Sequence, residues 1–410
     1  MVQLVPPRPR RGDITRHAAF LAKRMPELVK TSANGFRPVI QLDDGWMPRW
    51  QRWGDWVANE FFAAGLHALA TRVHRHRLEV GIWLAPFHVA ADSKLAEAHP
   101  DWLLKGNDGA PLVDPRLSRA YHILDPTHPR AQRFLDDLFR SLRRDGFSYF
   151  KLDFLYGAAY EAGRHDPEVT GTQALRLGLK RIVDAVNPPG KPEKAFVLAC
   201  GAPLMPIVGL VHGARTGGDV GIPQIEDGKA TAPQLGFPLI LSMARNQAAR
   251  LFLDRSLFAV DVDVAMAASP QLTPDEARVM ITIAALSGGI FMLGDDLETL
   301  PADRLALVRN PNVLGLVGGL TQELPPLWVR RETDGGAIVA VYNWSDAQRP
   351  YRLNFAEATG AGGTFAVTDL WSTRRGGRAR GVRTDTLRLT LPPHSVQLLK
   401  MKPAAAPARP

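Results

Sequence analysis

The chain has 410 residues, of which 45% are hydrophobic and 22% are charged, the composition of an ordinary globular protein that buries a full core. Its net charge is +9, but the arginines are scattered apart from one dense basic cluster at 374–383. No aromatic-basic or helix-turn-helix motif accompanies the charge, so nucleic-acid binding is not expected. The single cysteine, Cys200, excludes an intramolecular disulfide and a cysteine-based metal cluster.

No segment predicts a membrane span or a signal peptide. The apolar stretch 281–293 contains Ser and Gly and falls short of the roughly 20 residues that a spanning helix needs. Residues 1–13 hold prolines and arginines without an apolar core of signal-peptide length. We therefore expect no membrane partner and a cytoplasmic location.

Between about residues 15 and 310, short β-branched runs alternate with helical patterns, which indicates βα units around a parallel sheet. The predicted strands lie at 38–43, 80–86, 149–154, 195–200, 208–212, 256–262 and 289–294. The predicted helices lie at 14–30, 57–77, 129–144, 170–186, 233–250, 274–287 and 302–309. Pro129 and Pro274 fit the first turn of a helix, and Thr273 with Glu276 forms a capping pattern.

Seven strands after a leading helix predict a (β/α)8 TIM-type barrel that lacks its first strand. That strand should precede Ile14, but the prolines and arginines of 1–13 predict irregular chain. After about residue 325 the pattern changes to strands alone, typical of an antiparallel β-sandwich. We expect an irregular N-terminus at 1–13, a catalytic barrel at 14–322, a C-terminal β-sandwich at 323–402 and a disordered tail at 403–410.

Active sites in such barrels are built from residues at the carboxyl ends of the strands. These positions are rich in acids and hold neither a Ser–His pair at a nucleophile elbow nor a histidine cluster, so serine-based and zinc-based hydrolysis are not expected. They comprise Asp43, Asp44, Trp46, Trp83, Lys151, Asp153, Cys200, Arg215, Asp219, Asp261, Asp263, Asp295 and Asp296.

Lys151 and Asp153 are two residues apart on a predicted strand and therefore point to the same side. One interpretation is an internal salt bridge. The other is functional, because a carboxylate beside a lysine keeps a low pKa and stays ionised, as a nucleophile needs.

Arg215 and Asp219 flank Gly217 and Gly218, which allow positive φ and a close approach to a ligand. A glycine turn with a local ion pair is the alternative interpretation. In the functional one, the negative charge of Asp153 raises the pKa of Asp219 toward that of a proton donor.

The turn Asp43-Asp44-Gly45-Trp46 either merely ends a strand or supplies acids that accept from vicinal sugar hydroxyls. Tryptophans that stack on a pyranose ring would complete a sugar site, and each of them fits the protein core equally well. They are Trp46, Trp53, Trp56 and Trp83.

Six ordered motifs carry a family resemblance. They are QLDDGW from Gln41, GIWLAPF from Gly81, HPDW from His99, FKLDF from Phe150, LACG from Leu198 and the stretch 215–219. Together they resemble the melibiase-like α-galactosidases of glycoside hydrolase family 36, in a clan with families 27 and 31. The large N-terminal β-sandwich and the Gly-Trp-x-Ser-Trp-like first strand of that family have no counterpart in this sequence.

The resemblance implies that Asp153 is the nucleophile and Asp219 the general acid/base. It further implies a C-terminal antiparallel β-domain and a sugar pocket, and no metal or organic cofactor. The implied substrate-binding residues are Asp43 and Asp44 for the hydroxyls that distinguish galactose, Lys151 and Arg215 for other hydroxyls, and Trp83 and Cys200 in the pocket lining.

The sequence therefore predicts a retaining α-galactosidase that removes terminal α-linked galactose by double displacement. Two alternatives stay open: a galactosyltransferase similar to raffinose and stachyose synthases, and an inactive, truncated sugar-binding relative. The expected partner is a small carbohydrate, and assembly into a homo-oligomer is left open.

Overall fold

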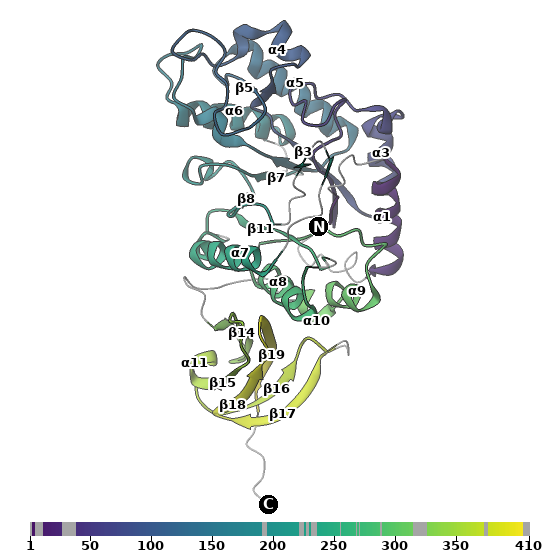
Figure 1. The fold of residues 1–410 in the computed structure, drawn as a ribbon, viewed down its shortest axis with the longest axis vertical. Coiled ribbons are helices and arrows are strands. Elements are labelled where there is room, and N and C mark those ends of the chain that lie inside the picture. The colour runs from purple at the N-terminus through teal and green to yellow at the C-terminus, as the bar shows by residue number, and fades with distance from the viewer. Residues whose placement is uncertain are drawn as a thin grey trace, which may run out of the picture. The chain divides into compact units, whose positions relative to one another are not determined.

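The computed structural model describes residues 2–4, 11–26, 38–190, 195–220, 225–226, 229–230, 236–254, 256–267, 269, 271–287, 289–314, 326–372 and 376–404. The chain divides into two compact units, Met1–Arg215 and Thr216–Pro410. Figure 1 shows the helices and strands of both units, coloured along the chain from purple at the N-terminus to yellow at the C-terminus.

A parallel sheet lies at the centre of the first unit. Its hydrogen-bonded neighbours follow the order β1, β2, β3, β6, β7, β8. The described side chains of these strands are nearly all buried, as is typical of parallel strands covered on both faces. The bounds are β1 (Val2–Leu4), β2 (Val39–Leu42), β3 (Glu79–Leu84), β6 (Tyr149–Leu152), β7 (Phe196–Ala199) and β8 (Gly213–Arg215).

The first strand, which the sequence predicted to be missing, is present as β1. Its pairing with β2 runs in parallel from Val2 and Ile40 to Leu4 and Leu42. The prediction was wrong because it took the prolines as evidence against a strand anywhere in residues 1–13. The strand needs only three residues, and these lie ahead of the prolines. Helix α1 (Arg11–Arg24) also begins before the predicted start at Ile14.

Helices cover the sheet of the first unit, and α3, α5 and α6 lie along it in Figure 1. Helix α5 starts with Pro129 and ends at Gly146 in a left-handed cap, and Thr170 with Gln173 forms a capping box at the start of α6. The remaining bounds are α3 (Gly65–His74), α5 (Pro129–Asp145), α6 (Gly171–Val186), η1 (Glu60–Phe62), η3 (Leu155–Ala159) and η4 (Met205–Ile207).

An excursion between β3 and α5 was not predicted. It contains an antiparallel hairpin of β4 (His88–Ala90) and β5 (Tyr121–Ile123), together with α4 (Lys94–Ala98) and η2 (Pro100–Trp102). Its strands have only three residues each, too few to show an alternating pattern in the sequence.

The predicted strand at 208–212 is wrong. This segment is a turn in which Gly209 has φ +76°, and the strand of the sheet is β8, a few residues later. An apolar run of five residues did not distinguish a strand from a buried turn, because periodicity cannot be read over so short a stretch.

The second unit begins with βα elements. Strands β11 (Ala259–Ala265) and β12 (Ile290–Leu293) pair in parallel. With the six strands above, the described residues hold eight parallel strands, the number of a (β/α)8 barrel. The other elements are β9 (Ile225–Glu226), β10 (Lys229–Ala230), α7 (Phe237–Arg250), η5 (Leu251–Leu253), α8 (Pro274–Leu286), α9 (Ala302–Val308) and α10 (Pro311–Leu314). Thr273 and Glu276 form the predicted capping box of α8.

An antiparallel sandwich completes the second unit. One sheet has the order β13, β14, β19, β16, β17, and β15 pairs with β18. Apolar residues of both sheets and of α11 form one buried core. The bounds are β13 (Leu327–Arg331), β14 (Ala337–Asn343), β15 (Arg349–Asn354), α11 (Phe355–Thr359), β16 (Thr364–Asp369), β17 (Arg378–Thr384), β18 (Thr386–Leu391) and β19 (Ser395–Pro403).

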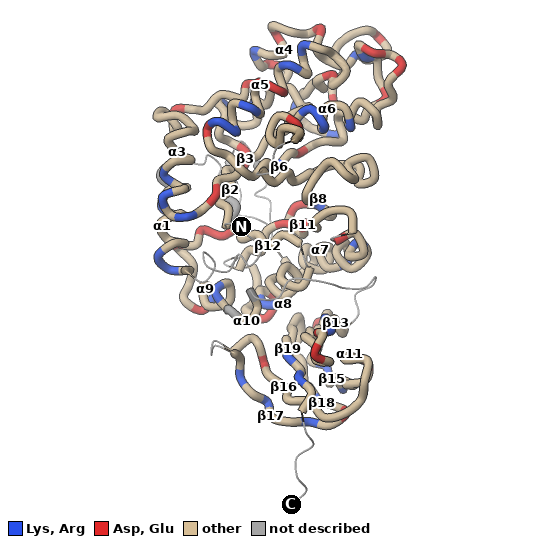
Figure 2. The backbone as a smooth tube through the Cα atoms, turned by 180° about the vertical axis from the view of Figure 1, so that it is seen from behind, with Lys and Arg blue, Asp and Glu red and all other residues tan. Residues whose placement is uncertain are grey.

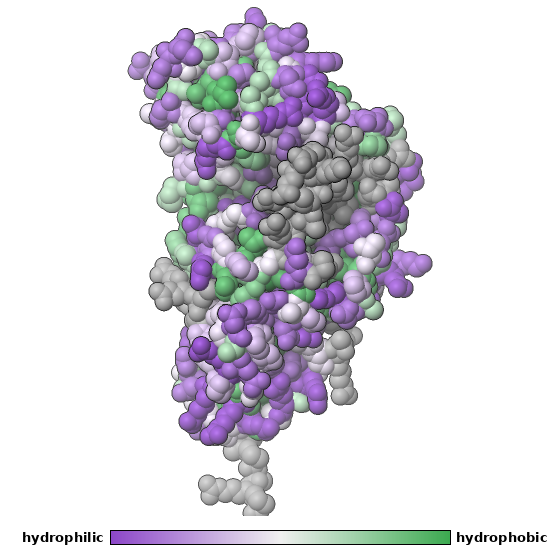
Figure 3. All heavy atoms as spheres, in the orientation of Figure 1, coloured by the Kyte–Doolittle hydropathy of each residue, from purple (hydrophilic) through white to green (hydrophobic). Residues whose placement is uncertain are grey.

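Strand β17 was not predicted, since its sequence reads as a basic cluster. It is the last strand of its sheet and almost wholly exposed, so no alternation of apolar residues marks it. Figure 2 shows its basic residues, and the sandwich surface drawn in Figure 3 is mostly hydrophilic. Within the described ranges, none of the helices has the length and apolar character needed to cross a membrane.

Candidate functional site

A buried ion pair lies at the carboxyl ends of β2 and β6. Lys151 Nζ is 3.0 Å from Asp43 Oδ2, and both side chains are less than one-tenth exposed. Gln41 Nε2 also donates to Asp43 Oδ2, at 2.5 Å. Burial opposes the charged form of Lys151, but the attraction of Asp43 outweighs it and holds the pKa of Lys151 above its ordinary value. Lys151 therefore stays charged at any ordinary pH.

Asp44 is the next acid, and its environment favours the protonated form. Burial and the neighbouring negative charge of Asp43 raise the pKa of Asp44 to about 7, with a smaller contribution from Asp153. The indole Nε1 of Trp53 donates to Asp44 Oδ1 at 3.2 Å, and Gly45 follows with φ +105°, which glycine adopts without strain. Asp44 can therefore change charge near neutral pH.

Both carboxylate oxygens of Asp153 accept hydrogen bonds from neutral donors. The indole Nε1 of Trp83 donates to Oδ2 at 3.0 Å, and the backbone N–H of Phe154 donates to Oδ1 at 2.7 Å. Phe154 has φ +52°, a left-handed conformation that is strained for a residue with a side chain. The half-buried carboxylate is thus held in one orientation while part of it stays open to a ligand.

Gly201 lies directly behind this carboxylate. A Cβ added there would come within 3.1 Å of the Phe154 nitrogen and 3.3 Å of Asp153 Oδ1, and Gly201 has φ +54°. The backbone carbonyl of Gly201 accepts from the N–H of Tyr156 at 2.8 Å. Only glycine fits this position without displacing the carboxylate or its neighbour.

Cys200 and Arg215 complete the predicted set in the first unit. Both are buried, at 5% exposure each, and both act electrostatically on Lys151. Cys200 follows β7 directly, and its N–H donates to Leu152 O at 2.7 Å. The predicted residues of this unit therefore gather around one charged centre at the strand ends.

The four predicted tryptophans form one aromatic cluster beside these acids. Trp46 stacks on Trp56 with 5.7 Å between ring centroids, and Trp53 lies 5.4 Å from Trp83. All four are at most 9% exposed, so most of their surface belongs to the core. The core interpretation thus holds for their packing, while the two indole N–H groups described above serve the acids.

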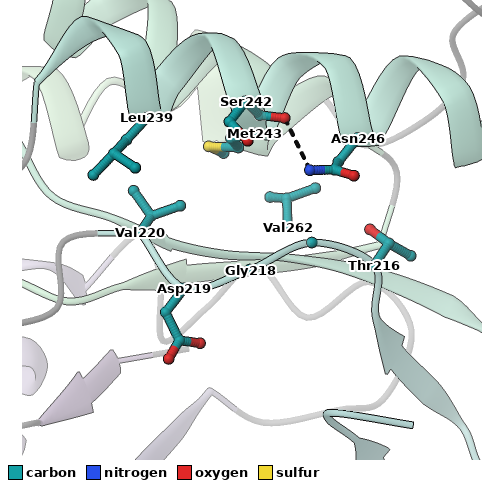
Figure 4. Close-up of a pocket in the computed structure, with 10 residues that line it drawn as sticks. Thr216, Gly218, Asp219, Val220, Leu239, Ser242, Met243, Asn246 and Val262 are labelled. Atoms are coloured by element: carbon teal, nitrogen blue, oxygen red, sulfur yellow. Dashed lines mark hydrogen bonds between the residues drawn. The ribbon is translucent and has the colours of Figure 1, made fainter. Parts of the chain in front are cut away.

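Asp219 belongs to the second unit and is exposed. In Figure 4 its carboxylate points away from the side chains of Leu239, Ser242 and Met243, which line a cavity of about 180 Å³ on the other side of its loop. The N–H of the following residue, Val220, donates to Asp263 Oδ2 at 2.6 Å. This loop is therefore anchored at its end by an acid of β11.

The structure differs from two expectations about this loop and about the acid that anchors it. Gly217 and Gly218 do not adopt the predicted positive φ, and a Cβ on Gly217 would make only ordinary contact with Asn246, at 3.5 Å. Asp263 lies within β11 rather than past its end, at a bulge where its own φ is +77°. A bulge shifts side-chain direction, which a sequence pattern of period two does not reveal.

Sequence reasoning missed two residues that shape this site, Phe154 and Gly201, and it named Asp263 only as an acid near a strand end. Phe154 and Gly201 act through backbone geometry, and Asp263 acts through a hydrogen bond to a main-chain N–H. The available signal for Gly201 was a glycine directly after the predicted strand at 195–200, whereas nothing in the sequence marked Phe154. Within the described ranges, no group of three or more His, Cys, Asp or Glu side chains is arranged to hold a metal ion.

Two segments of the chain match known family models. Residues 17–189 match the Melibiase family, and residues 323–401 match the alpha-galactosidase C-terminal beta-sandwich domain. The first segment includes Asp43, Lys151 and Asp153. Neither segment includes Asp219.

Among curated proteins, alpha-galactosidase 2 of Pediococcus pentosaceus is 29% identical over 139 residues, which are 33% of this chain and 18% of that protein. The solved structure of TtGalA, an alpha-galactosidase from Thermus thermophilus in complex with p-nitrophenyl alpha-D-galactopyranoside, is 28% identical. Its TM-score is 0.58, and the match covers 78% of this chain and 61% of that one. The chain thus spans less than two thirds of the length of these relatives.

A third similarity concerns the fold. A GH27 β-L-arabinopyranosidase from Geobacillus stearothermophilus has a TM-score of 0.69 and 18% identity, over 98% of this chain and 94% of that one. Together with the topology of the strands, this confirms the predicted fold class, a TIM-like parallel barrel followed by an antiparallel β-sandwich.

Proposed function

We propose that this chain, whose resemblance to the melibiase-like α-galactosidases is confirmed by its two family matches, is a retaining α-galactosidase. One observation carries the proposal: the half-buried Asp153 is held at both oxygens by neutral donors, beside a buried Lys151–Asp43 pair. A fixed carboxylate at the mouth of a barrel strand suits nucleophilic attack on an anomeric carbon. The assignment to family 36 is part of this proposal and rests on the six ordered motifs.

The proposed reaction has two steps. Asp153 attacks the anomeric carbon while Asp219 gives its proton to the leaving oxygen, so the glycosidic bond breaks and a β-linked galactosyl-enzyme forms. Asp219, now ionised, takes a proton from water, whose oxygen attacks the same carbon and releases Asp153. Galactose leaves with its α configuration retained.

We assign the sugar-binding roles by charge and position. Asp43 and Asp44 accept from galactose hydroxyls, Lys151 and Arg215 donate to others, and Trp83 and Cys200 line the pocket. Asp44 has to lose its proton to accept from two hydroxyls at once, so substrate binding by this residue strengthens as the pH rises toward 7. The substrate class is an oligosaccharide or glycoside that ends in α-galactose.

The assignment is tested by measuring the turnover of a nitrophenyl α-galactoside by the wild type and by the variants Asp153→Ala and Asp219→Ala. The control is Asp108→Ala, a variant in an exposed turn. We expect full activity in the control and a loss of at least about 1,000-fold in both site variants. Full activity in either of them would overturn the site.

Added azide distinguishes the two roles. In Asp153→Ala, azide attacks in place of the nucleophile and gives the β-galactosyl azide. In Asp219→Ala, it attacks the β-linked intermediate and gives the α-galactosyl azide. The same azide anomer from both variants would contradict the proposed roles.

Two further measurements define the reaction. Proton NMR of the first-formed sugar should show α-galactose, and β-galactose would exclude retention. A crystal structure should place the two carboxyl groups about 5–5.5 Å apart, against about 6.5–9.5 Å for an inverting enzyme. With excess sucrose as acceptor, free galactose should remain the main product, since a dominant trisaccharide would identify a transferase.

A further inference from the structure

A buried hydrogen-bond network lies behind the loop that follows Asp153. Its centre is Asp114, which accepts from His88 Nε2 at 2.7 Å, from the hydroxyls of Tyr156 and Tyr160 at 2.8 Å each, and from the N–H of Arg116 at 2.9 Å. The side chains of Asp114 and His88 are fully buried. A buried carboxylate with donors on both oxygens makes its surroundings rigid.

The network joins two segments that are separate in sequence. His88 and Asp114 belong to the excursion that carries the β4–β5 hairpin, whereas Tyr156 and Tyr160 belong to η3 and its end. Gly157 of η3 approaches the hairpin so closely that an added Cβ would lie 2.6 Å from His88 Cε1. The two hydroxyls therefore fasten η3 against the hairpin.

Helix η3 starts immediately after Phe154, the residue whose N–H holds Asp153 Oδ1. A left-handed conformation at a residue with a side chain costs about 1–3 kcal/mol and persists only where the surroundings enforce it. The ring of Phe154 packs 5.5 Å from that of His88 and 4.8 Å from that of Trp53, centroid to centroid. The network thus contacts Phe154 through its ring and through the chain that follows it.

The charge states of Asp114 and the two tyrosines are stable across the working pH of an enzyme. Burial alone would raise the pKa of Asp114, but the hydrogen bonds from His88, Arg116 and the tyrosines outweigh it and hold that pKa well below its usual range. Burial and the bond to Asp114 raise the pKa of Tyr160 to about 12, and they raise that of Tyr156 as well. The hydroxyls therefore keep donating and the carboxylate keeps accepting.

We propose that the Asp114 network is a positioning device for the nucleophile. It holds η3 against the hairpin, keeps Phe154 in its left-handed conformation and so aims the Phe154 N–H at Asp153 Oδ1. None of its members has to touch the substrate. The proposal rests on the proposed function in one respect, the role of Asp153 as nucleophile.

The double variant Tyr156→Phe/Tyr160→Phe tests this inference, because it removes two donors and keeps both rings. We expect kcat to fall about 10- to 100-fold, the size of effect that misplacing a reacting group causes, while KM changes less than about two-fold. KM should change little because Asp43 and Lys151, which we propose bind the sugar, lie outside the network. The matched control is Tyr121→Phe, whose buried hydroxyl donates to the carbonyl of Gln51 and should leave kcat unchanged.

A kcat of the double variant equal to that of the control would overturn the proposal. So would a rise in KM with kcat intact, since that result indicates a substrate-binding role. Asp114→Asn provides a second variant, in which the new amide NH₂ faces a donor instead of accepting, and a comparable loss of kcat is expected there.

Crystal structures of the wild type and the double variant give a readout that needs no activity. The variant should lose the positive φ of Phe154 and the hydrogen bond from its N–H to Asp153. If the wild type proves inactive on α-galactosides, the proposed function fails, and these structures still decide the inference. An unchanged Phe154 in the variant would refute it.

Discussion

The indole Nε1 of Trp83 donates a 3.0 Å hydrogen bond to Asp153 Oδ2, from one strand of the sheet to the end of the next. The family resemblance implies that Trp83 also lines a sugar pocket. Because the ring is only 2% exposed, its N–H acts on the carboxylate more than its face can act on a sugar. Trp83 is thus a residue that orients Asp153.

Trp83→Phe keeps a buried aromatic ring and removes this donor. A hydrogen bond to a charged group contributes about 1.5–3 kcal/mol, so we expect kcat on a nitrophenyl α-galactoside to fall roughly 10- to 100-fold. Trp328→Phe in the sandwich is the control, because Trp328 Nε1 has no hydrogen-bond partner among the described residues. Equal kcat values for the two variants would show that the indole N–H does not matter.

Gly201→Ala should move the nucleophile. The added Cβ would meet Phe154 and Asp153 at 3.1 and 3.3 Å, and the left-handed backbone adds strain. Gly190→Ala has the same kind of backbone, at φ +77°, with nothing within 4 Å of the added atom. We expect both to lose stability, about 1–3 kcal/mol, and only Gly201→Ala to lose kcat. Thermal melts and kinetics measure the two effects separately.

Lys151→Met should destabilise the fold, because it leaves Asp43 charged, buried and without its cation. Breaking a buried ion pair from one side costs about 3–5 kcal/mol. The exposed pair of Lys180 and Asp184, at 2.6 Å, provides the comparison, and Lys180→Met should cost no more than about 0.5 kcal/mol. Urea unfolding at pH 7 measures both. Adding Asp43→Asn to Lys151→Met should restore part of the loss, and strict additivity would contradict the coupling.

Asp44 should make stability depend on pH. Its pKa is about 7 in the folded chain, above the ordinary value of 3.8, so the folded state binds the proton more tightly than the unfolded state. The resulting stabilisation is complete below about pH 4 and is lost as the pH rises toward 7, by at most about 1.4 kcal/mol per pH unit.

Urea unfolding of the wild type and Asp44→Asn between pH 4 and 7.5 checks this prediction. The free energy of unfolding of the wild type should decline relative to that of the variant as the pH rises. Asp108→Asn, on an exposed turn, controls for the change from acid to amide. A constant difference between the wild type and Asp44→Asn would contradict the raised pKa.

The amino-acid sequence by itself determined the class of fold and which residues stand at the strand ends. Strand order follows from alternating βα patterns, and parallel strands bring their carboxyl ends to one edge, so the places of Asp43, Lys151 and Asp153 could be derived without coordinates. Local chemistry also sufficed for the capping box of Thr273 and Glu276.

Only the tertiary structure decided how these side chains are held. The partner of Lys151 in the short ion pair is Asp43, 108 residues away, and Asp114 collects donors from η3, more than 40 residues later. Such contacts depend on how chain segments pack, which no pattern along the sequence records. The same holds for β1, a strand of three residues that is too short to show a pattern in the sequence and is fixed by its pairing with β2.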